Sequence, residues 1–340
     1  MQTLREAGDP EVTYVGGEGG VEEALAGRAH VPFVGIPAGG LHGVGLGRAA
    51  QNIVKLIQGL WAAYKLGRRE RPSVLLATGG YASVPVAIAA WLLRVPIVVY
   101  LPDVEPGLAV RFIARLASKV AVTVEDSRAY FADRKVVVTG YPVRKEFHNV
   151  DRVEARRALG LTVDDPVLLV MGGSRGARSI NQALDGILEE VLELAQVVHL
   201  SGQLDWEAVA VRRAELPDGL RERYRAYPYL HEMGTALAAS NLVVCRAGAS
   251  TLGELPFFGL PGILVPYPHA WRYQRVNADW LTKRGAAITL RDEPLREALL
   301  PTLKQLMTDE KRLDQMAAQA RGLSRPHAAA RLAATLRGLS

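Results

Sequence analysis

The chain has 340 residues, of which 49% are hydrophobic and 22% charged, a balance that fits folded domains and excludes a disordered chain. Its single cysteine, Cys245, excludes an internal disulfide and favours a reducing compartment. The net charge of +6 suits nucleic acid, anionic lipid or phosphorylated substrates alike and does not choose among them.

Short apolar runs alternate with longer amphipathic stretches. The runs expected as strands are residues 12–15, 74–78, 97–101, 120–124, 136–139, 167–171, 197–200, 223–227, 242–245, 262–265 and 287–290. Helical patterns lie between them, for example at 49–66 and 178–194. Because several runs are wholly apolar, as in parallel strands covered on both faces, the alternation predicts α/β, doubly wound sheets.

The alternation breaks near residues 139–150, and a helix-like stretch at 151–159 opens a second series. We therefore expect an N-terminal domain of residues 1–146 and a C-terminal domain of residues 147–340. Two such sheets would direct the carboxyl ends of their strands, where α/β folds bind ligands, toward one cleft.

Glycine-rich turns follow two expected strands of the second series. In VLLVMGGSRGARSIN, the Gly-Gly-Ser turn ending at Ser174 leads into a helix, and Arg175 and Arg178 add positive charge, so the turn suits a phosphate or is simply a tight connection. In CRAGASTLGE, Ser250 or Thr251 could cap a helix or touch phosphate. Glu254 could accept hydrogen bonds from ribose hydroxyls or merely complement the helix dipole.

Two further segments carry residues that bear on ligand binding. In PYPHAWRYQRVNA, Gln274 and Asn277 are three residues apart, so both can share a helix face and bind sugar hydroxyls, or be ordinary surface amides. The GGEGG segment after residues 12–15 is rejected as a dinucleotide site, because Glu22 stands where the last glycine belongs and Glu18 would repel pyrophosphate.

Taken together, the motifs resemble those of the MurG family of peptidoglycan glycosyltransferases. GGYASVPVAIAAWLLRVPIVV, EPGLAVR, TGYPVR, MGGSRGARSIN, VVCRAGASTLGEL and GLPGILVPYP match in order over nearly the whole chain. The resemblance implies the GT-B fold, two Rossmann-like doubly wound parallel-sheet domains facing a cleft. It also implies inverting transfer of N-acetylglucosamine from its UDP donor to undecaprenyl-pyrophosphoryl-MurNAc-pentapeptide.

The resemblance also implies site residues. Ser174 and its loop would hold the diphosphate, Leu230 would contact uracil through its backbone, and Glu254 would bind the ribose. The residues assigned to the donor in this way are Arg144, Ser174, Leu230, Arg246, Ala249, Ser250, Thr251, Leu252, Gly253, Glu254 and Gln274. Neither metal nor other cofactor is expected, because helix dipoles and basic side chains can stabilise the departing UDP. The expected partners are the UDP-sugar and a lipid-linked acceptor at the cytoplasmic face of the membrane, not nucleic acid.

Two departures concern the acceptor half. The family begins with a strand and a GGTGGH loop, whereas this sequence begins in what reads as the following helix, so we expect roughly 20 to 30 further residues upstream in the native protein. At residues 100–103 the family's His-Glu-Gln-Asn is replaced by Tyr-Leu-Pro-Asp. Asp103 could be the catalytic base or a structural turn residue.

An apolar stripe at helical spacing precedes a basic cluster of Lys65, Arg68, Arg69 and Arg71. The stripe consists of Ile53, Leu56, Ile57, Leu60, Trp61 and Tyr64. It is either core or a peripheral membrane surface. Two other functions stay open: a related transferase acting on another lipid, and a nucleotide-sugar-binding homologue without catalysis.

Overall fold

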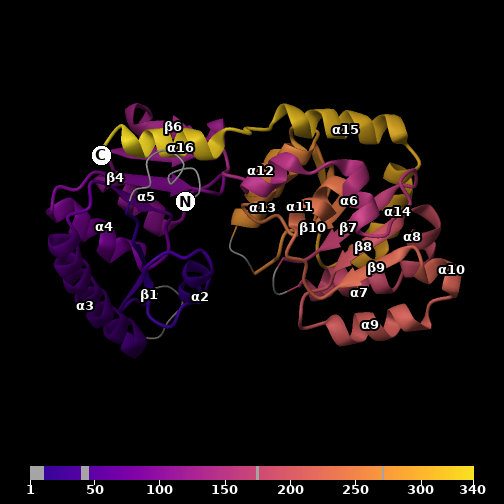
Figure 1. The fold of residues 1–340 in the computed structure, drawn as a ribbon, viewed down its shortest axis with the longest axis horizontal. Helices are drawn as coiled ribbons and strands as arrows, with labels where there is room; N and C mark the ends of the chain where they lie inside the picture. Colours follow the sequence, from indigo (N-terminus) through magenta and orange to yellow (C-terminus); the bar gives the residue numbers. More distant parts are fainter. Residues whose placement is uncertain (1–10, 40–45, 174–175, 270–271) are drawn as a thin grey trace. The chain divides into compact units, whose positions relative to one another are not determined.

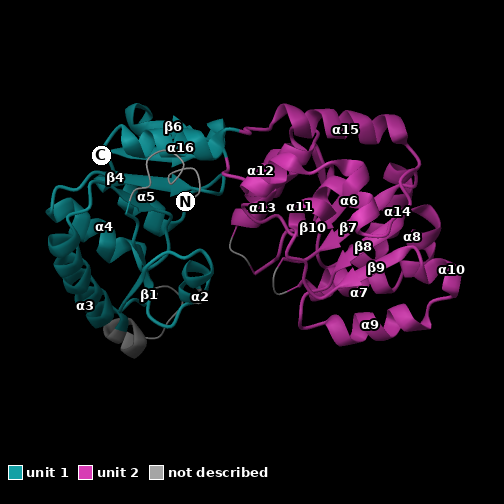
Figure 2. Cartoon of the chain, viewed as in Figure 1, with its two compact units in different colours: residues 1–140, 327–340 teal, residues 141–326 magenta. Residues whose placement is uncertain are grey.

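The computed structural model describes residues 11–39, 46–173, 176–269 and 272–340. The chain forms two compact units, residues 1–140 with 327–340, and residues 141–326 (Figures 1 and 2). The sequence assigned residues 327–340 to the second domain and placed the boundary six residues later. Arg331 Nε donates to Thr139 O at 2.9 Å, and Leu336 packs on Val98 and Tyr100, which explains why this tail belongs with the first unit.

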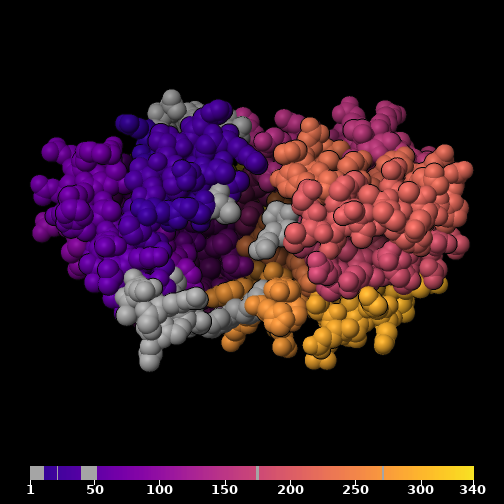
Figure 3. All heavy atoms as spheres, turned by 90° about the horizontal axis from the view of Figure 1, so that it is seen from below, coloured from indigo at the N-terminus to yellow at the C-terminus, as the bar shows by residue number. Residues whose placement is uncertain are grey.

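The first unit contains two parallel sheets, β1-β2 and β3-β4-β5-β6. Its elements are β1 (Tyr14–Gly17), α2 (Val21–Arg28), β2 (Phe33–Ile36), α3 (Leu46–Glu70), β3 (Leu75–Ala77), α4 (Ser83–Leu92), β4 (Ile97–Leu101), α5 (Leu108–Leu116), β5 (Lys119–Val122), the 3-10 helices η1 (Glu125–Tyr130) and η2 (Asp133–Lys135), β6 (Val136–Val138) and α16 (Ala328–Arg337). The segment from β1 to β2 forms a continuous surface area, indigo in Figure 3. Among the described residues, β1 and β3 do not pair, so the single sheet expected here is divided into two. The start of the chain, on which the missing-strand expectation rests, lies outside the described residues.

The second unit has one parallel sheet of order β12-β11-β10-β7-β8-β9. Its elements are the 3-10 helix η3 (Lys145–Asn149), α6 (Arg152–Ala158), β7 (Val167–Met171), α7 (Arg178–Asp185), α8 (Leu188–Leu194), β8 (Gln196–Leu200), α9 (Trp206–Glu215), α10 (Asp218–Arg221), β9 (Tyr224–Tyr227), α11 (Met233–Ala239), β10 (Leu242–Cys245), α12 (Thr251–Phe258), β11 (Gly262–Leu264), α13 (Tyr273–Thr282), β12 (Ala287–Thr289), α14 (Leu295–Met307) and α15 (Glu310–Gly322). The first strand, β7, lies in the middle, and the later strands extend to both sides, which is the doubly wound arrangement.

Side-chain chemistry explains the regularity of this unit. All residues of β8 and β10 are buried, as the apolar runs predicted for strands covered by helices on both faces. α6 begins where Asp151 accepts hydrogen bonds from the backbone N–H groups of Val153 and Glu154, at 2.8 and 3.0 Å. The single helix expected at 178–194 is instead α7 and α8, because Ile187 leaves the helical conformation with φ −132° and ψ 13°.

Candidate functional site

Three of the predicted segments meet at one edge of the second sheet. β7 and β10 are neighbours, and the connections leaving them run toward opposite sides of the sheet, so the gap between their carboxyl ends is the topological switch point where such folds bind ligands. The GGS turn follows β7, the CRAGAST segment follows β10, and the segment containing Gln274 follows β11, the next strand along. The topology thus brings together motifs that are about 100 residues apart, on adjacent strands whose connections the parallel order fixes.

The loop after β7 depends on glycine. Gly173 and Gly176 have φ of +82° and +79°, and Gly176 N–H donates to Gly173 O at 3.0 Å. A Cβ at Gly172 would overlap the backbone nitrogen of Ala177, so the loop folds tightly onto the start of α7. Ala177 supplies no side-chain cap, which leaves the first N–H groups of α7 available to an anion. Ser174, predicted to hold the diphosphate, lies outside the described residues.

Arg246 directly follows β10, and its side chain donates hydrogen bonds to three different segments. Its guanidinium donates to Asp292 Oδ1 at 2.5 Å, to Ser179 Oγ at 2.8 Å and to Val265 O at 3.1 Å. The side chain therefore ties the loops after β10 and β11 to α7. It carries a carboxylate partner already, so any charge that it offers to a diphosphate is partly offset by Asp292. Its predicted role in offsetting the departing diphosphate stays a prediction.

Residues 249–254 form the turn into α12 and its first turn. Of the two roles predicted for Ser250 or Thr251, the helix cap is wrong: Ser250 makes no capping bond, and Thr251 Oγ1 donates back to Gly248 O at 2.6 Å. The phosphate contact stays a prediction. The first amides of α12 are bonded within the backbone: Thr251 N–H donates to Gly248 O at 3.1 Å and Leu252 N–H donates to Ala249 O at 3.1 Å. Ala249 and Gly253 are partly exposed, whereas Leu252 is buried and supports the turn from beneath.

Glu254 is mostly buried beside two groups that favour its charge. Burial raises the pKa of the Glu254 carboxyl, while the positive charge of Arg144 and a hydrogen bond from Ser250 act in the opposite direction. Arg144 itself is exposed, four residues into the second unit, with its guanidinium 6.0 Å from the ring centre of Phe147. The carboxylate is thus placed as an acceptor in the first turn of α12.

The two amides of α13 have different surroundings. Gln274 is partly exposed, and its Oε1 accepts from Tyr267 N–H at 2.9 Å, which leaves its NH₂ group as a donor for a ligand. Asn277 is fully buried and donates to Ala247 O at 3.2 Å, so it braces the loop after β10. The hypothesis that both amides bind a sugar is therefore wrong for Asn277. Leu230 lies half-buried between β9 and α11.

Asp103 belongs to the first unit and follows β4 at its carboxyl end, half-buried. That position suits a side chain that acts at the edge of a parallel sheet. The apolar stripe is in α3 of the same unit. Ile53, Ile57 and Trp61 are at least half exposed, so the core interpretation is wrong for them.

Sequence reasoning missed the side chains that hold the site. Asp292 is 46 residues from Arg246, and Tyr141 packs on Gly253 from the link between the units. His199 is a lone histidine in an apolar strand and gave no motif. The available signal was Asn181, which closes the MGGSRGARSIN motif and contacts His199.

No three His, Cys, Asp or Glu side chains gather as a metal site would within the parts of the chain that the structure describes. In the same residues, every helix is too short or too polar to cross a bilayer.

Family models match both halves of the chain. The glycosyltransferase family 28 N-terminal domain matches residues 1–122, and the glycosyltransferase family 28 C-terminal domain matches residues 167–332. A relative from Roseiflexus sp. (strain RS-1), a UDP-N-acetylglucosamine–N-acetylmuramyl-(pentapeptide) pyrophosphoryl-undecaprenol N-acetylglucosamine transferase, is 41% identical over 96% of this chain and 83% of its own length. The chain belongs to glycosyltransferase family 28 and, within it, to the MurG family. A relative of the same name from Desulforudis audaxviator is 37% identical over 94% of this chain and 88% of its own.

Solved structures agree with the family 28 fold. The crystal structure of Acinetobacter baumannii MurG matches with a TM-score of 0.79 at 24% identity, over 99% of this chain and 93% of that one. A UDP-GlcNAc 2-epimerase from Neisseria meningitidis, bound to UDP-GlcNAc, matches with a TM-score of 0.63 at 12% identity, over 93% and 88%. Since an epimerase shares the GT-B fold, the fold alone does not separate the two activities.

Proposed function

We propose that this chain transfers N-acetylglucosamine from UDP-N-acetylglucosamine to undecaprenyl-pyrophosphoryl-MurNAc-pentapeptide, in the synthesis of peptidoglycan. The named relatives, which the chain matches over almost its whole length, support this reaction. The observation that carries the donor assignment is the meeting of three ligand-suited loops at the carboxyl ends of β7, β10 and β11.

Each donor contact follows from a group at that edge. The loop after β7 and the uncapped start of α7 would receive the diphosphate, since free N–H groups and the dipole favour an anion. Glu254 would accept from the ribose, the backbone at Leu230 would bind uracil, and Gln274 would donate to the sugar. No metal is required in this scheme, because these donors and Arg246 would stabilise the negative charge that develops on UDP.

The reaction is written as an inverting displacement. An acceptor sugar hydroxyl attacks the anomeric carbon, the bond from that carbon to the UDP oxygen breaks, and a base takes the hydroxyl proton. Asp103 is the candidate base, at the carboxyl end of β4. Asp103→Asn should then lower kcat by about 100-fold or more and leave the donor KM unchanged, since a general base contributes at least that factor. An unchanged kcat would assign Asp103 to the turn alone.

We also infer that the first unit binds the cytoplasmic face of the membrane peripherally. Small residues line the inner face of α3: Gly59 lies against Pro37, and Gly67 lies against Leu93. The large apolar side chains therefore face outward, and an open groove of about 490 Å³ is lined by Ile57, Leu60, Trp61, Tyr64 and Leu92.

A basic rim accompanies this apolar surface. Lys65 Nζ lies 3.2 Å from the ring centre of Trp61, and Arg68 and Arg94 are exposed on α3 and just beyond α4. Apolar side chains beside cations suit an anionic bilayer, where each cation near the surface contributes about 1 kcal/mol. Anionic vesicles should therefore carry the protein upward in flotation. The Ile57→Ser/Trp61→Ser variant should float less, whereas Leu204→Ser, at a comparably exposed leucine of the second unit, should not change flotation.

The transfer assay uses the full chain, labelled UDP-N-acetylglucosamine and the lipid-linked muramyl-pentapeptide in vesicles. We expect labelled lipid product. Glu254→Ala should raise the donor KM by about tenfold, whereas Glu297→Ala, an exposed glutamate of α14, should not change it. Transfer from UDP-glucose to diacylglycerol instead would favour another lipid acceptor. Donor binding without transfer or hydrolysis would favour a non-catalytic homologue.

A further inference from the structure

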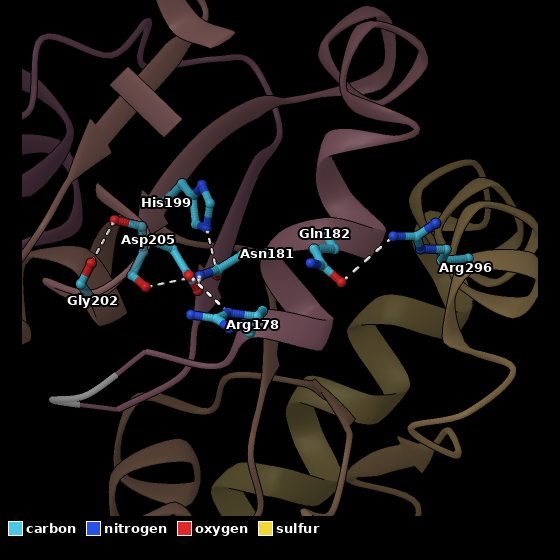
Figure 4. A network of polar contacts seen from close by, with 8 residues as sticks. Arg178, Asn181, Gln182, His199, Gly202, Asp205 and Arg296 are labelled. Carbon is cyan, nitrogen blue, oxygen red and sulfur yellow. Dashed lines mark hydrogen bonds and ion pairs between the residues drawn. The ribbon is translucent and has the colours of Figure 1, made fainter. Parts of the chain in front are cut away.

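A chain of polar groups, most of them buried, connects α7 with the neighbouring strands, and Figure 4 shows its members His199, Asn181 and Asp205. Tyr224 Oη lies 2.6 Å from His199 Nδ1, and His199 Nε2 lies 3.0 Å from Asn181 Oδ1. Asn181 Nδ2 donates to Asp205 Oδ2 and to Ser201 O, both at 2.8 Å. These residues come from β9, β8, α7 and the loop before α9, so the network joins four separate parts of the unit.

The donors and acceptors fix one direction for these bonds. Because the Asn181 amide NH₂ faces two acceptors, its carbonyl faces His199, and Nε2 of His199 must donate. His199 Nδ1 must then accept from the Tyr224 hydroxyl. Burial lowers the pKa of His199 to about 4, which keeps the ring neutral and limited to one N–H at neutral pH. Only one set of hydrogen-bond directions therefore gives every donor in the network an acceptor.

Two parts of this network reach the region after β7, one at Gly176 in the loop and one at Arg178, the first residue of α7. A Cβ at Gly176 would overlap Ser201 O, the same carbonyl that Asn181 binds, so Gly176 lies directly on the supported turn. Asp205 Oδ1 accepts from Arg178 Nε at 3.2 Å, while the Arg178 side chain remains 70% exposed. Ser201 O thus supports the backbone at Gly176, and Asp205 fixes the Arg178 guanidinium.

We propose that Tyr224, His199, Asn181 and Asp205 form a positioning network that sets the loop after β7 and Arg178 for the donor diphosphate. The proposal rests on the proposed function, which places the diphosphate at this loop. None of the first three side chains can touch the ligand, because they are buried. They act through the backbone of Gly176 and through Arg178, and Arg178 becomes a diphosphate-binding residue.

The test compares UDP with uridine, which lacks the diphosphate, as ligands of the full-length protein in calorimetry or ligand-observed NMR. Asn181→Ala should weaken UDP binding by about tenfold, because it removes the support under Gly176 and leaves buried groups unpaired. Uridine affinity should stay within about twofold, since the uracil and ribose contacts come from other loops. The matched control is Gln182→Ala, at the adjacent exposed position, which contacts only Arg296 in Figure 4 and should change neither affinity.

Asp205→Asn distinguishes the contribution made through Gly176 from the contribution made through Arg178. The amide retains an acceptor for Asn181 but loses the anionic partner of Arg178, so UDP affinity should fall less than in Asn181→Ala. Adding Arg178→Gln to Asp205→Asn should cause no loss beyond that of Arg178→Gln alone.

A merely structural network would lower UDP and uridine affinity together. An unchanged ratio of the two affinities in folded Asn181→Ala and Asp205→Asn proteins overturns the proposal and leaves the donor site intact. If the unmodified protein itself binds UDP no better than uridine, the diphosphate assignment under the proposed function is overturned as well.

Discussion

Tyr141 packs against Gly253 so closely that a Cβ added to Gly253 would lie 2.5 Å from the Cβ of Tyr141. Tyr141 is the first residue of the second unit, and Gly253 belongs to the first turn of α12, one residue before Glu254. The segment that connects the two units therefore touches the turn assigned to the nucleotide. Only glycine allows this approach.

Gly253→Ala should destabilise the protein by about 1–3 kcal/mol, as expected when a side chain is inserted into a packed contact. It should also weaken UDP binding, because Tyr141 and the turn must separate. Gly248→Ala is the control, since a Cβ at Gly248 meets no atom within 4 Å. Thermal unfolding of the ligand-free proteins measures the difference, and equal stability of the two variants would contradict the contact.

The only cysteine should be unreactive in the folded protein. The Cys245 thiol is 1% exposed, and burial, followed by the nearby Glu254 charge, raises its pKa to about 12. Ellman's reagent at pH 8 should label no thiol in the native state and one thiol per chain after unfolding in guanidinium. Ser340→Cys, at an exposed position, should react at once without denaturant. Rapid native labelling of Cys245 would show that the β10 edge opens readily.

Acid should destabilise the protein through His199. Burial lowers its pKa from 6.5 to about 4, so between these values the unfolded chain binds a proton that the folded chain does not. The free energy of unfolding should therefore fall as the pH drops through this window, by about 3 kcal/mol at 1.36 kcal/mol per pH unit. Above pH 6.5 the contribution is constant.

Denaturant titrations across this pH range measure that loss. His199→Gln should lose its share of the acid sensitivity, whereas His327→Gln, at an exposed histidine, should retain it. Identical pH profiles of the His199 variant and the unmodified protein would show that another group is responsible.

Glu254 should make nucleoside binding sensitive to acid. Its raised pKa means that the carboxylate gains a proton at a higher pH than an exposed glutamate does, and the protonated form is a weaker acceptor for ribose hydroxyls. Uridine, which has no titrating phosphate, should bind more weakly as the pH falls toward the raised pKa of Glu254. Glu254→Gln should bind uridine about tenfold more weakly at neutral pH, with the pH dependence lost. If the variant keeps the same dependence, the ribose contact lies elsewhere.

The sequence predicts most of the sheet architecture because burial on both faces requires nearly continuous apolar runs. Residues 97–101, 167–171 and 242–245 are strands with the predicted bounds. The strand Phe33–Ile36 was missed, since Gly35 interrupts its apolar run and Pro32 and Pro37 flank it, and both residue types are depleted in strands. Glycine-rich turns were found because their backbone conformations restrict the residue type.

Long-range side-chain partners leave no such pattern. The pairing of Arg246 with Asp292 and the assignment of residues 327–340 to the first unit depend on contacts between distant segments. For the same reason both roles predicted for Asn277, a sugar-binding amide or a surface amide, are wrong, since it is buried against Ala247 O. Its helical spacing from Gln274 shows a shared face and does not tell whether that face meets ligand or backbone.

The return of the chain to the first unit at residue 327 has a practical outcome for dissection of the protein. Residues 141–326 are an insertion within the first unit, so they can be expressed as one uninterrupted gene segment, whereas the first unit cannot. A C-terminal truncation before α16 would remove Leu336 from its contacts with Val98 and Tyr100. It would therefore destabilise the first unit, although most of that unit is encoded at the other end of the gene. A fragment meant to isolate the first unit must carry α16 on a linker or as a separate peptide.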